Sequence, residues 1–369
     1  MRYLYYCNST YQLLTVMNLH WHRKNASFED VKDYHGDLIL LNAFAGAEDI
    51  VKLLNNHHVF DEARVMEKNP KTGSFRRIRS ILELISPMFY LSSRHGFRKE
   101  EIMNRYVALV VPKYNTAVGA IWRVNKNADL HLYEDGLGTY YLNTALLKSH
   151  SRSYRFLYEK GFAKDFTHFS RLYLNAPELY SGTWNKDIRA VPKFDRGYLK
   201  EVQSLFKDFA RTDNEEDKDI FWLAQMLEND EAIRIIGETL QKLEGHKKRV
   251  LYCPHPRWPE PEGSVFDRSP EKQIWEMKLL NMKDVNEKLF ISIHSTACLT
   301  PKLLFDEEPY LILFYHLIDD AVTERNERFD HTMKLFIDSY RDKEKIMLPK
   351  TQEGFVQCVE SFTNRTEKK

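Results

Sequence analysis

The chain has 369 residues, of which 43% are apolar, so it is long enough for about two domains with sizeable cores. Its 54 lysines and arginines nearly balance its 53 aspartates and glutamates, which argues against a nucleic-acid-binding protein held by overall charge. No stretch approaches the roughly 18 consecutive apolar residues of a membrane-spanning helix, and the first residues lack the apolar core of a secretory signal. We therefore expect a cytoplasmic protein.

The four cysteines are Cys7, Cys253, Cys298 and Cys358, and none forms a Cys-x-x-Cys pair with another. This spacing argues against both a zinc site and a disulfide framework. We expect each cysteine to be a small buried apolar residue rather than a reactive thiol.

Apolar runs and amphipathic stretches alternate through the first half of the chain. Strands separated by helices at this spacing are typical of parallel βαβ units, so we expect an α/β fold. The pattern predicts strands over residues 2–7, 37–42, 106–113 and 128–135 and helices over residues 9–21, 46–57 and 116–127.

Residues 175–197 interrupt this alternation, because they are rich in proline, glycine and polar residues. We place a domain boundary there, with an N-terminal domain over 1–185 and a C-terminal domain over 186–369 that ends in helices. In the second half we predict strands over residues 219–225, 249–254, 274–280, 289–294 and 310–315 and helices over residues 232–245 and 295–305. Two such sheets with a cleft between them are expected to bind ligands beyond the carboxyl ends of their strands.

The first polar group at a strand end is Glu134-Asp135-Gly136. A carboxylate at this place can accept a proton from a hydroxyl, as a general base must, and the glycine lets the backbone turn sharply. The alternative is that Asp135 only caps the next turn, as aspartate often does before glycine.

The second group is His255, which stands between Pro254 and Pro256 and is followed by Arg257. Proline and the residue before it both lose the helical conformation, so His255 is expected to be held rigidly. A rigid histidine beside an arginine suits an anionic phosphate, because one can donate a proton and the other supplies fixed charge. The alternative is a structural histidine in a proline-rich loop.

The third group is Ser295 and Thr296, which open a predicted helix directly after a strand that ends in His294. Free N–H groups at a helix start, together with two hydroxyls, can bind phosphate or carboxylate. Capping alone would also select serine or threonine there. Gln225, at the end of the predicted strand at 219–225, is a further donor-side candidate.

Together these groups suit the transfer of a group from a phosphate-bearing donor to a hydroxyl. Neither an Asp-x-Asp pattern nor a His/Cys cluster stands at these strand ends, so we expect chemistry without a metal or another cofactor.

The order of these motifs resembles a known family. Glu-Asp-Gly at 134–136, His-Pro at 255–256 and Ser-Thr at 295–296 resemble the three short motifs of bacterial sialyltransferases of glycosyltransferase family 52, which build lipooligosaccharide and capsule ends, and of the related polysialyltransferases. The opening Tyr-Tyr-Cys-Asn-Ser-Thr-Tyr-Gln-Leu-Leu also resembles the strand, polar loop and helix with which such chains begin.

The resemblance implies a GT-B fold, in which two Rossmann-like domains face each other across a cleft. It also implies an acceptor-binding N-terminal domain and a C-terminal domain that binds CMP-sialic acid without a divalent metal. Because the tertiary anomeric carbon of sialic acid favours an oxocarbenium-like transition state, we expect direct attack with inversion. The expected acceptor is a hydroxyl of a terminal sugar, galactose, on a bacterial surface glycan.

By the same resemblance Asp135 is the general base and His255 contacts the CMP phosphate and assists its departure. Ser295 and Thr296 would hold the donor phosphate or the sialic acid carboxylate. Other expected donor-side residues are Pro256, Arg257 and Gln225, and the expected acceptor-side residues are Asn8, Ser9, Thr10, Glu134 and Gly136.

Two alternatives stay open. A related glycosyltransferase could use a UDP-hexose or UDP-N-acetylhexosamine donor, and a protein of another class could bind glycans or assemble capsule without catalysis. Intact Asp135 and His255 count against the second alternative, because binding alone would need no base. The sequence leaves a homodimer open.

A basic segment over residues 74–99 raises the separate hypothesis of peripheral contact with the inner face of an anionic membrane, where a lipid-linked acceptor is found. The favoured reading is an ordinary helix with a solvated basic face. Its cations, interleaved with apolar side chains, are Arg76, Arg77, Arg79, Arg94, Arg98 and Lys99.

Overall fold

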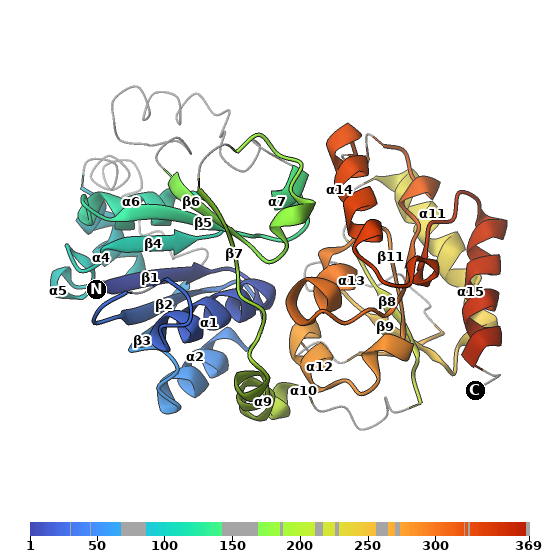
Figure 1. Ribbon diagram of the computed structural model, residues 1–369, viewed down its shortest axis with the longest axis horizontal. Coiled ribbons are helices and arrows are strands. Elements are labelled where there is room, and N and C mark those ends of the chain that lie inside the picture. The colour runs from blue at the N-terminus through green and yellow to red at the C-terminus, as the bar shows by residue number, and fades with distance from the viewer. Residues whose placement is uncertain are drawn as a thin grey trace. The chain divides into compact units, whose positions relative to one another are not determined.

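The computed structural model describes residues 1–29, 31–44, 46–67, 86–141, 169–184, 187–210, 217–225, 229–255, 265–269, 274–320, 322–323 and 325–366. The chain divides into two compact units, Met1–Lys193 and Phe194–Lys369. Each unit is an α/β layer built on its own parallel sheet (Figure 1).

The first unit contains a seven-stranded sheet with the order β3-β2-β1-β4-β5-β6-β7, and every neighbouring pair is parallel. Its strands are β1 (Arg2–Cys7), β2 (His35–Asn42), β3 (Glu62–Glu67), β4 (Ala108–Val111), β5 (Asp129–Tyr133), β6 (Phe169–Leu174) and β7 (Asp187–Ala190). Its helices are α1 (Thr10–Lys24), α2 (Ala47–Asn56), α4 (Pro87–His95), α5 (Lys99–Ile102), α6 (Thr116–Val124) and α7 (Gly138–Tyr141), with a 3₁₀ turn at Pro177–Leu179.

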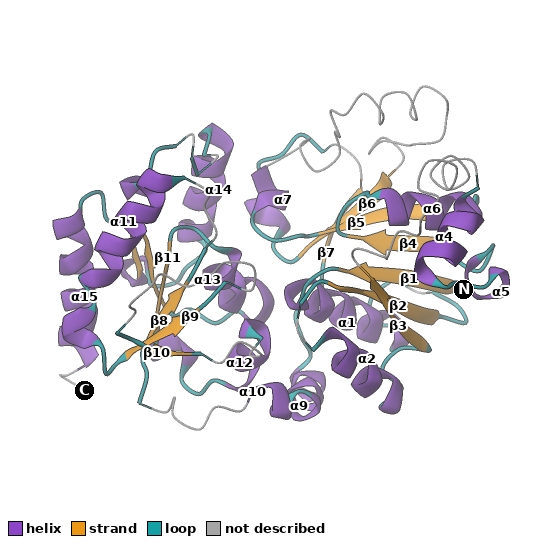
Figure 2. Cartoon of the chain, turned by 180° about the vertical axis from the view of Figure 1, so that it is seen from behind, coloured by secondary structure: helices purple, strands orange, loops and turns teal. Residues whose placement is uncertain are grey.

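Helices cover both faces of this sheet. Parallel strands are joined by right-handed crossovers, so α1 and α2, which lead from β1 to β3, lie on one face and α6, which joins β4 to β5, lies on the other. Figures 1 and 2 show this arrangement, with α4 beside α6. Burial on both faces explains why β4 is apolar throughout.

The second unit contains a six-stranded sheet with the order β10-β9-β8-β11-β12-β13. Its strands are β8 (Ile220–Leu223), β9 (Val250–Cys253), β10 (Asp267–Arg268), β11 (Leu289–Ser292), β12 (Tyr310–Leu313) and β13 (Ile346–Met347). Its helices are α9 (Arg196–Leu205), α10 (Lys207–Ala210), α11 (Asp230–Gln241), α12 (Trp275–Asn281), α13 (Thr296–Thr300), α14 (Glu327–Asp338) and α15 (Gln352–Thr366). Short 3₁₀ turns lie at Glu244–His246, Val285–Glu287, Tyr315–Leu317 and Lys343–Lys345.

Three sequence expectations are corrected. Residues 274–280, predicted as a strand, form α12, because a short apolar run does not by itself distinguish a strand from a buried helix. Residues 187–190, inside the predicted boundary loop, form β7 and pair with β6, so the first unit extends to Lys193 rather than 185. The helix predicted over 295–305 is α-helical only to Thr300 and continues as a π-helix over Pro301–Phe305, because Pro301 has no N–H to donate to the α-helical hydrogen bonds.

The cysteine prediction is confirmed for Cys7, Cys253 and Cys298, which are free and buried, whereas Cys358 on α15 is free but only partly buried. Burial raises the pKa of the Cys7 thiol to about 12, so it is not a reactive thiolate. Within the described ranges no helix is long and apolar enough to cross a membrane.

Candidate active site

The strand order creates a switch point in each sheet. In the first unit the chain runs from β1 outward through β2 to β3 and then returns to β4 on the other side of β1. The loops after β1 and β4 therefore leave in opposite directions, and the crevice between them is where open α/β sheets bind ligands. The second unit repeats this arrangement between β8 and β11.

Asp135 lies beside the first switch point, just after β5. Gln12, in the first turn of α1, donates a hydrogen bond from Nε2 to Asp135 Oδ1, and Lys113, after β4, places Nζ 3.8 Å from Oδ2. The Asp135 side chain keeps 23% of its surface exposed. Two residues from elements far apart in the sequence thus hold one carboxylate that solvent can still reach.

The turn after Asp135 depends on Gly136. Its φ of 97° lies in the left-handed region that L side chains rarely adopt. The Asp135 backbone N–H also donates to Thr139 Oγ1 at 2.8 Å, which fixes the turn from the other side. The sequence expectation that glycine presents the aspartate therefore has a definite backbone reason.

Glu134 is fully buried and serves a different purpose from its neighbour. Its carboxylate accepts hydrogen bonds from the hydroxyls of Tyr11 and Tyr140 and, at 2.8 Å, from the backbone N–H of Asn175. Burial raises the pKa of the Glu134 carboxyl, and these hydrogen bonds act in the opposite direction. Glu134 braces α1, α7 and the end of β6 against β5, and with no exposed surface it does not meet an acceptor directly.

The loop after β1 contains the other predicted acceptor-side residues. Ser9 caps α1, accepting the Gln12 N–H at 3.4 Å on its hydroxyl, and Thr10 is the first, buried residue of the helix. Asn8 is only 8% exposed, yet neither its Oδ1 nor its Nδ2 has a hydrogen-bond partner among the described residues. A buried amide in this state calls for water or a ligand.

In the second unit, a hydrogen bond connects Gln225 to the loop that follows β11. Gln225, after β8, accepts the His294 backbone N–H on Oε1 at 3.1 Å. Ser295 caps α13, and its Oγ accepts the Ala297 N–H at 3.3 Å. The Ser295 hydroxyl is therefore engaged in capping, and Thr296 begins a helix of only 5 residues. Burial lowers the pKa of His294 to about 4, so this ring is neutral near pH 7.

His255 follows β9 and is half-buried. Pro256 and Arg257 lie outside the described residues, so the structure gives no geometry for the expected His-Arg pair. The part of residues 74–99 before Ser86 lies outside them as well. In the remainder, Arg98 is engaged by Glu101, with Arg98 Nη2 2.6 Å from Glu101 Oε1.

Sequence reasoning missed Gln12 and Lys113. Gln12 has the sequence signature of an ordinary capping residue, and Lys113 follows a strand for which no motif was recognised.

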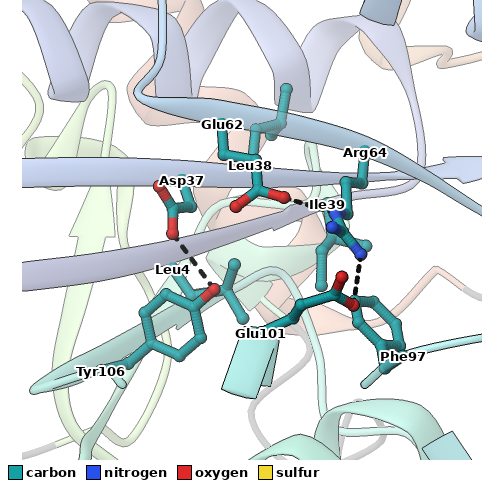
Figure 3. Close-up of a pocket in the computed structure, with 9 residues that line it drawn as sticks. All are labelled: Leu4, Asp37, Leu38, Ile39, Glu62, Arg64, Phe97, Glu101 and Tyr106. Atoms are coloured by element: carbon teal, nitrogen blue, oxygen red, sulfur yellow. Dashed lines mark hydrogen bonds and ion pairs between the residues drawn. The ribbon is translucent and has the colours of Figure 1, made fainter. Parts of the chain in front are cut away.

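The pocket in Figure 3 lies on the opposite side of the first sheet, where its strands begin. We call the side where the strands begin the amino edge and the side where they end the carboxyl edge. The pocket has a cavity volume of about 10 Å³, room for one water at most, and is too small for a sugar. Nor do the described residues contain a group of three or more His, Cys, Asp or Glu side chains placed to hold a metal ion.

Comparison with solved structures supports the GT-B class. A UDP-GlcNAc 2-epimerase from Methanocaldococcus jannaschii, solved with UDP-GlcNAc and UDP, is 13% identical and has a TM-score of 0.51, covering 99% of this chain and 93% of its own. The ADP-heptose LPS heptosyltransferase II of E. coli is 9% identical, with a TM-score of 0.44 and all of both chains covered. At such identity the likeness to the epimerase concerns the fold alone, and together with the two parallel sheets it confirms the expected pair of Rossmann-like α/β units.

Sequence comparison addresses the family. No curated protein sequence matches the chain. A family model described as alpha-2,8-polysialyltransferase (POLYST) matches residues 3–307, which include the strand ends that bear Asp135, His255 and Ser295. The motifs resembled both glycosyltransferase family 52 and the polysialyltransferases, and this model describes the second of these. The chain belongs to the alpha-2,8-polysialyltransferase family.

Proposed function

We propose that this protein is an inverting, metal-independent sialyltransferase that moves sialic acid from CMP-sialic acid to a hydroxyl of a terminal sugar on a bacterial surface glycan. The observation that carries the proposal is a partly exposed carboxylate, Asp135, held beside the switch point of the first sheet in a chain of this family. Glycosyltransferase activity of this kind requires a base where the acceptor hydroxyl binds.

In the proposed reaction, the oxygen of the acceptor hydroxyl attacks the anomeric carbon of sialic acid, and Asp135 accepts the proton of that hydroxyl. The bond from that carbon to the CMP phosphate oxygen breaks, and the electron pair leaves with CMP. Attack opposite to the leaving group inverts the anomeric centre. Between the two adjacent carboxylates, Asp135 suits the role because it is 23% exposed, whereas Glu134 is fully buried.

The second unit is proposed to hold the donor. His255, with Pro256 and Arg257, would bind the CMP phosphate and supply the proton or positive charge that CMP needs as it departs. A single phosphate needs only one such group, which is why we propose that EDTA leaves the activity intact. Gln225 supports the loop that bears Ser295 and Thr296 through its bond to His294, and these residues would bind phosphate or the sugar carboxylate.

The acceptor is proposed to contact Asn8. Its Oδ1 and Nδ2 are buried and have no partner among the described residues, so we propose that a bound water satisfies them and extends the contact to a sugar hydroxyl. The proposed acceptor sugar is galactose. The family description favours a second candidate, the 8-hydroxyl of a terminal sialic acid.

The test is release of CMP from CMP-sialic acid in EDTA, measured without acceptor, with a lactose-type acceptor and with a sialylated acceptor. Acceptor-stimulated release supports the proposal, and the more effective acceptor identifies the sugar. Turnover of UDP-sugars instead would overturn the donor, and binding of glycans without any release would favour the non-catalytic alternative. The same release is measured for Asp135→Asn, which removes the proposed base. Asp49→Asn is its matched control, because Asp49 lies on α2 and its carboxylate is 70% exposed.

A further inference from the structure

Gln12 joins the ends of two strands in the first unit. Its Oε1 accepts the backbone N–H of Asn8, just after β1, at 2.6 Å, and its Nε2 donates to Oδ1 of Asp135, just after β5. Gln12 itself is only 2% exposed. It therefore touches the proposed base without being open to a substrate.

The chemistry of its partners fixes the orientation of this amide. A backbone N–H can only donate, so it must face the amide oxygen. The amide nitrogen is then turned toward Asp135, and a carboxylate accepts such a bond most strongly when it is ionised. The interaction favours the state of Asp135 that can take up a proton.

A glutamine at position 12 has a simpler explanation, a helix-capping role, but that role does not explain why the residue is glutamine rather than glutamate. Ser9 caps α1 and Gln12 is the third helical residue, so Ser-x-x-Gln has the pattern of a capping box. In that motif the side chain returns to the N–H of the cap residue, and glutamate serves as well as glutamine, with an added benefit from the helix dipole. Here the oxygen reaches Asn8 instead. A glutamate would keep that contact but bring a second carboxylate against Asp135.

We propose that Gln12 is a positioning residue, which holds the Asp135 carboxylate in place and in its ionised form through an amide oriented by the Asn8 backbone. This inference rests on the proposed role of Asp135 as the base. It predicts that the amide donor, rather than the capping acceptor, is what position 12 must provide.

The first experiment is a thermal-stability cycle that needs no activity. We expect Gln12→Glu to lower the Tm at pH 7, because two carboxylates then face each other, and to lose less at pH 5, where the pair holds a proton. The double variant Gln12→Glu/Asp135→Asn should recover most of the lost Tm, since the amide introduced at position 135 can donate to the new carboxylate. Gln352→Glu is the matched control, because Gln352 begins α15 and hydrogen-bonds a hydroxyl, Thr239 Oγ1, at 3.0 Å.

The second experiment is the pH profile of kcat/KM for CMP release. In Gln12→Met we expect the acid limb to move upward by about one pH unit, because a carboxylate that loses a donor takes up protons more readily. We also expect kcat to fall about tenfold through poorer placement of the base. A residue that only caps the helix would lower the Tm and leave the acid limb in place.

The two proposals fail in different ways. If the wild type releases CMP but Gln12→Met keeps the wild-type acid limb, or if the double variant recovers no stability, the role of Gln12 is wrong and the proposed function stands. If the wild type does not turn over CMP-sialic acid while the stability cycle shows the expected recovery, the proposed donor is wrong and the contact between Gln12 and Asp135 stands.

Discussion

Asp37 at the amino edge of the first sheet is enclosed by cations, whereas Asp135 at the carboxyl edge is held by an amide and stays partly open. Arg2 Nη1 lies 2.6 Å from Asp37 Oδ1 and Arg105 Nη2 lies 3.0 Å from Oδ2. The Tyr106 hydroxyl donates to the same carboxylate at 3.2 Å (Figure 3). The Lys113 ammonium approaches Asp135 less closely, at 3.8 Å.

The same contrast extends to the neighbours. At the amino edge, Glu62 and Glu101 both pair with Arg64, at 2.5 and 2.9 Å. At the carboxyl edge, the buried Asn8 amide has no partner among the residues that the structure describes. Carboxylates that are paired with arginines have few free hydrogen-bonding positions for a ligand, whereas a carboxylate held mainly by a neutral donor can still take up a proton. We therefore interpret the amino edge as structural and propose that the chemistry takes place at the carboxyl edge.

Replacement of Asp135 tests this comparison with the largest expected effect. We expect Asp135→Asn to lower kcat by about 10²- to 10⁴-fold, because the proton acceptor is lost. CMP binding should be nearly unchanged, since CMP is assigned to the second unit. Rates and CMP affinity should be measured beside Asp49→Asn; a strong loss of CMP affinity, or a near-normal rate, would contradict the assignment of the base.

His255→Ala tests the donor side. We expect binding of CMP-sialic acid and turnover to fall together, by about tenfold or more, because a contact to the leaving phosphate acts both in binding and as CMP departs. Steady-state kinetics with CMP-sialic acid measure both quantities, and His331→Ala, at an exposed position on α14, is the control. Near-normal activity in His255→Ala would remove this residue from the site.

The amino edge should respond in the reverse manner. We expect Asp37→Ala to lower the free energy of unfolding by about 2 kcal/mol, because two arginines lose their common partner. The Arg2 and Arg105 side chains are 27% and 24% exposed, so water compensates part of the loss. Urea denaturation measures the change, and kcat per folded molecule should stay at the wild-type value. A fall in kcat without a loss of stability would show that the two edges are not functionally distinct.

The sequence predicts that Asp135 lies at the end of a strand, but it does not predict which distant side chains contact Glu134 and Asp135. The strand pattern placed Asp135 at a strand end, and Gly136 indicated the turn. That Glu134 is buried depends on Tyr11, Tyr140 and Asn175, two of which are distant in sequence.

The position of Gln12 was equally hidden, because a capping pattern explains the residue without any reference to Asp135. Short apolar runs misled at residues 274–280, where only packing decides between strand and helix. The local signals thus identified candidate groups, and the tertiary contacts decided which of them remain accessible.

The smallest expected effect concerns the pH dependence of the amino edge. Hydrogen bonds from Arg64 and from the Arg98 backbone hold the pKa of Glu101 at about 2, below its unfolded value of about 4.3. For a carboxyl whose pKa is lowered by folding, the stabilisation is present above the unfolded pKa and is lost as the pH falls toward the folded one. We therefore expect Glu101→Gln to lower the Tm slightly at pH 7, with a gap from wild type that narrows between pH 5 and pH 3. Glu100→Gln, at a side chain 68% exposed, should show no such narrowing. If the Tm difference between Glu101→Gln and wild type stays constant across this range, packing rather than charge stabilises the amino edge. The contrast with Asp135 would then rest on burial alone.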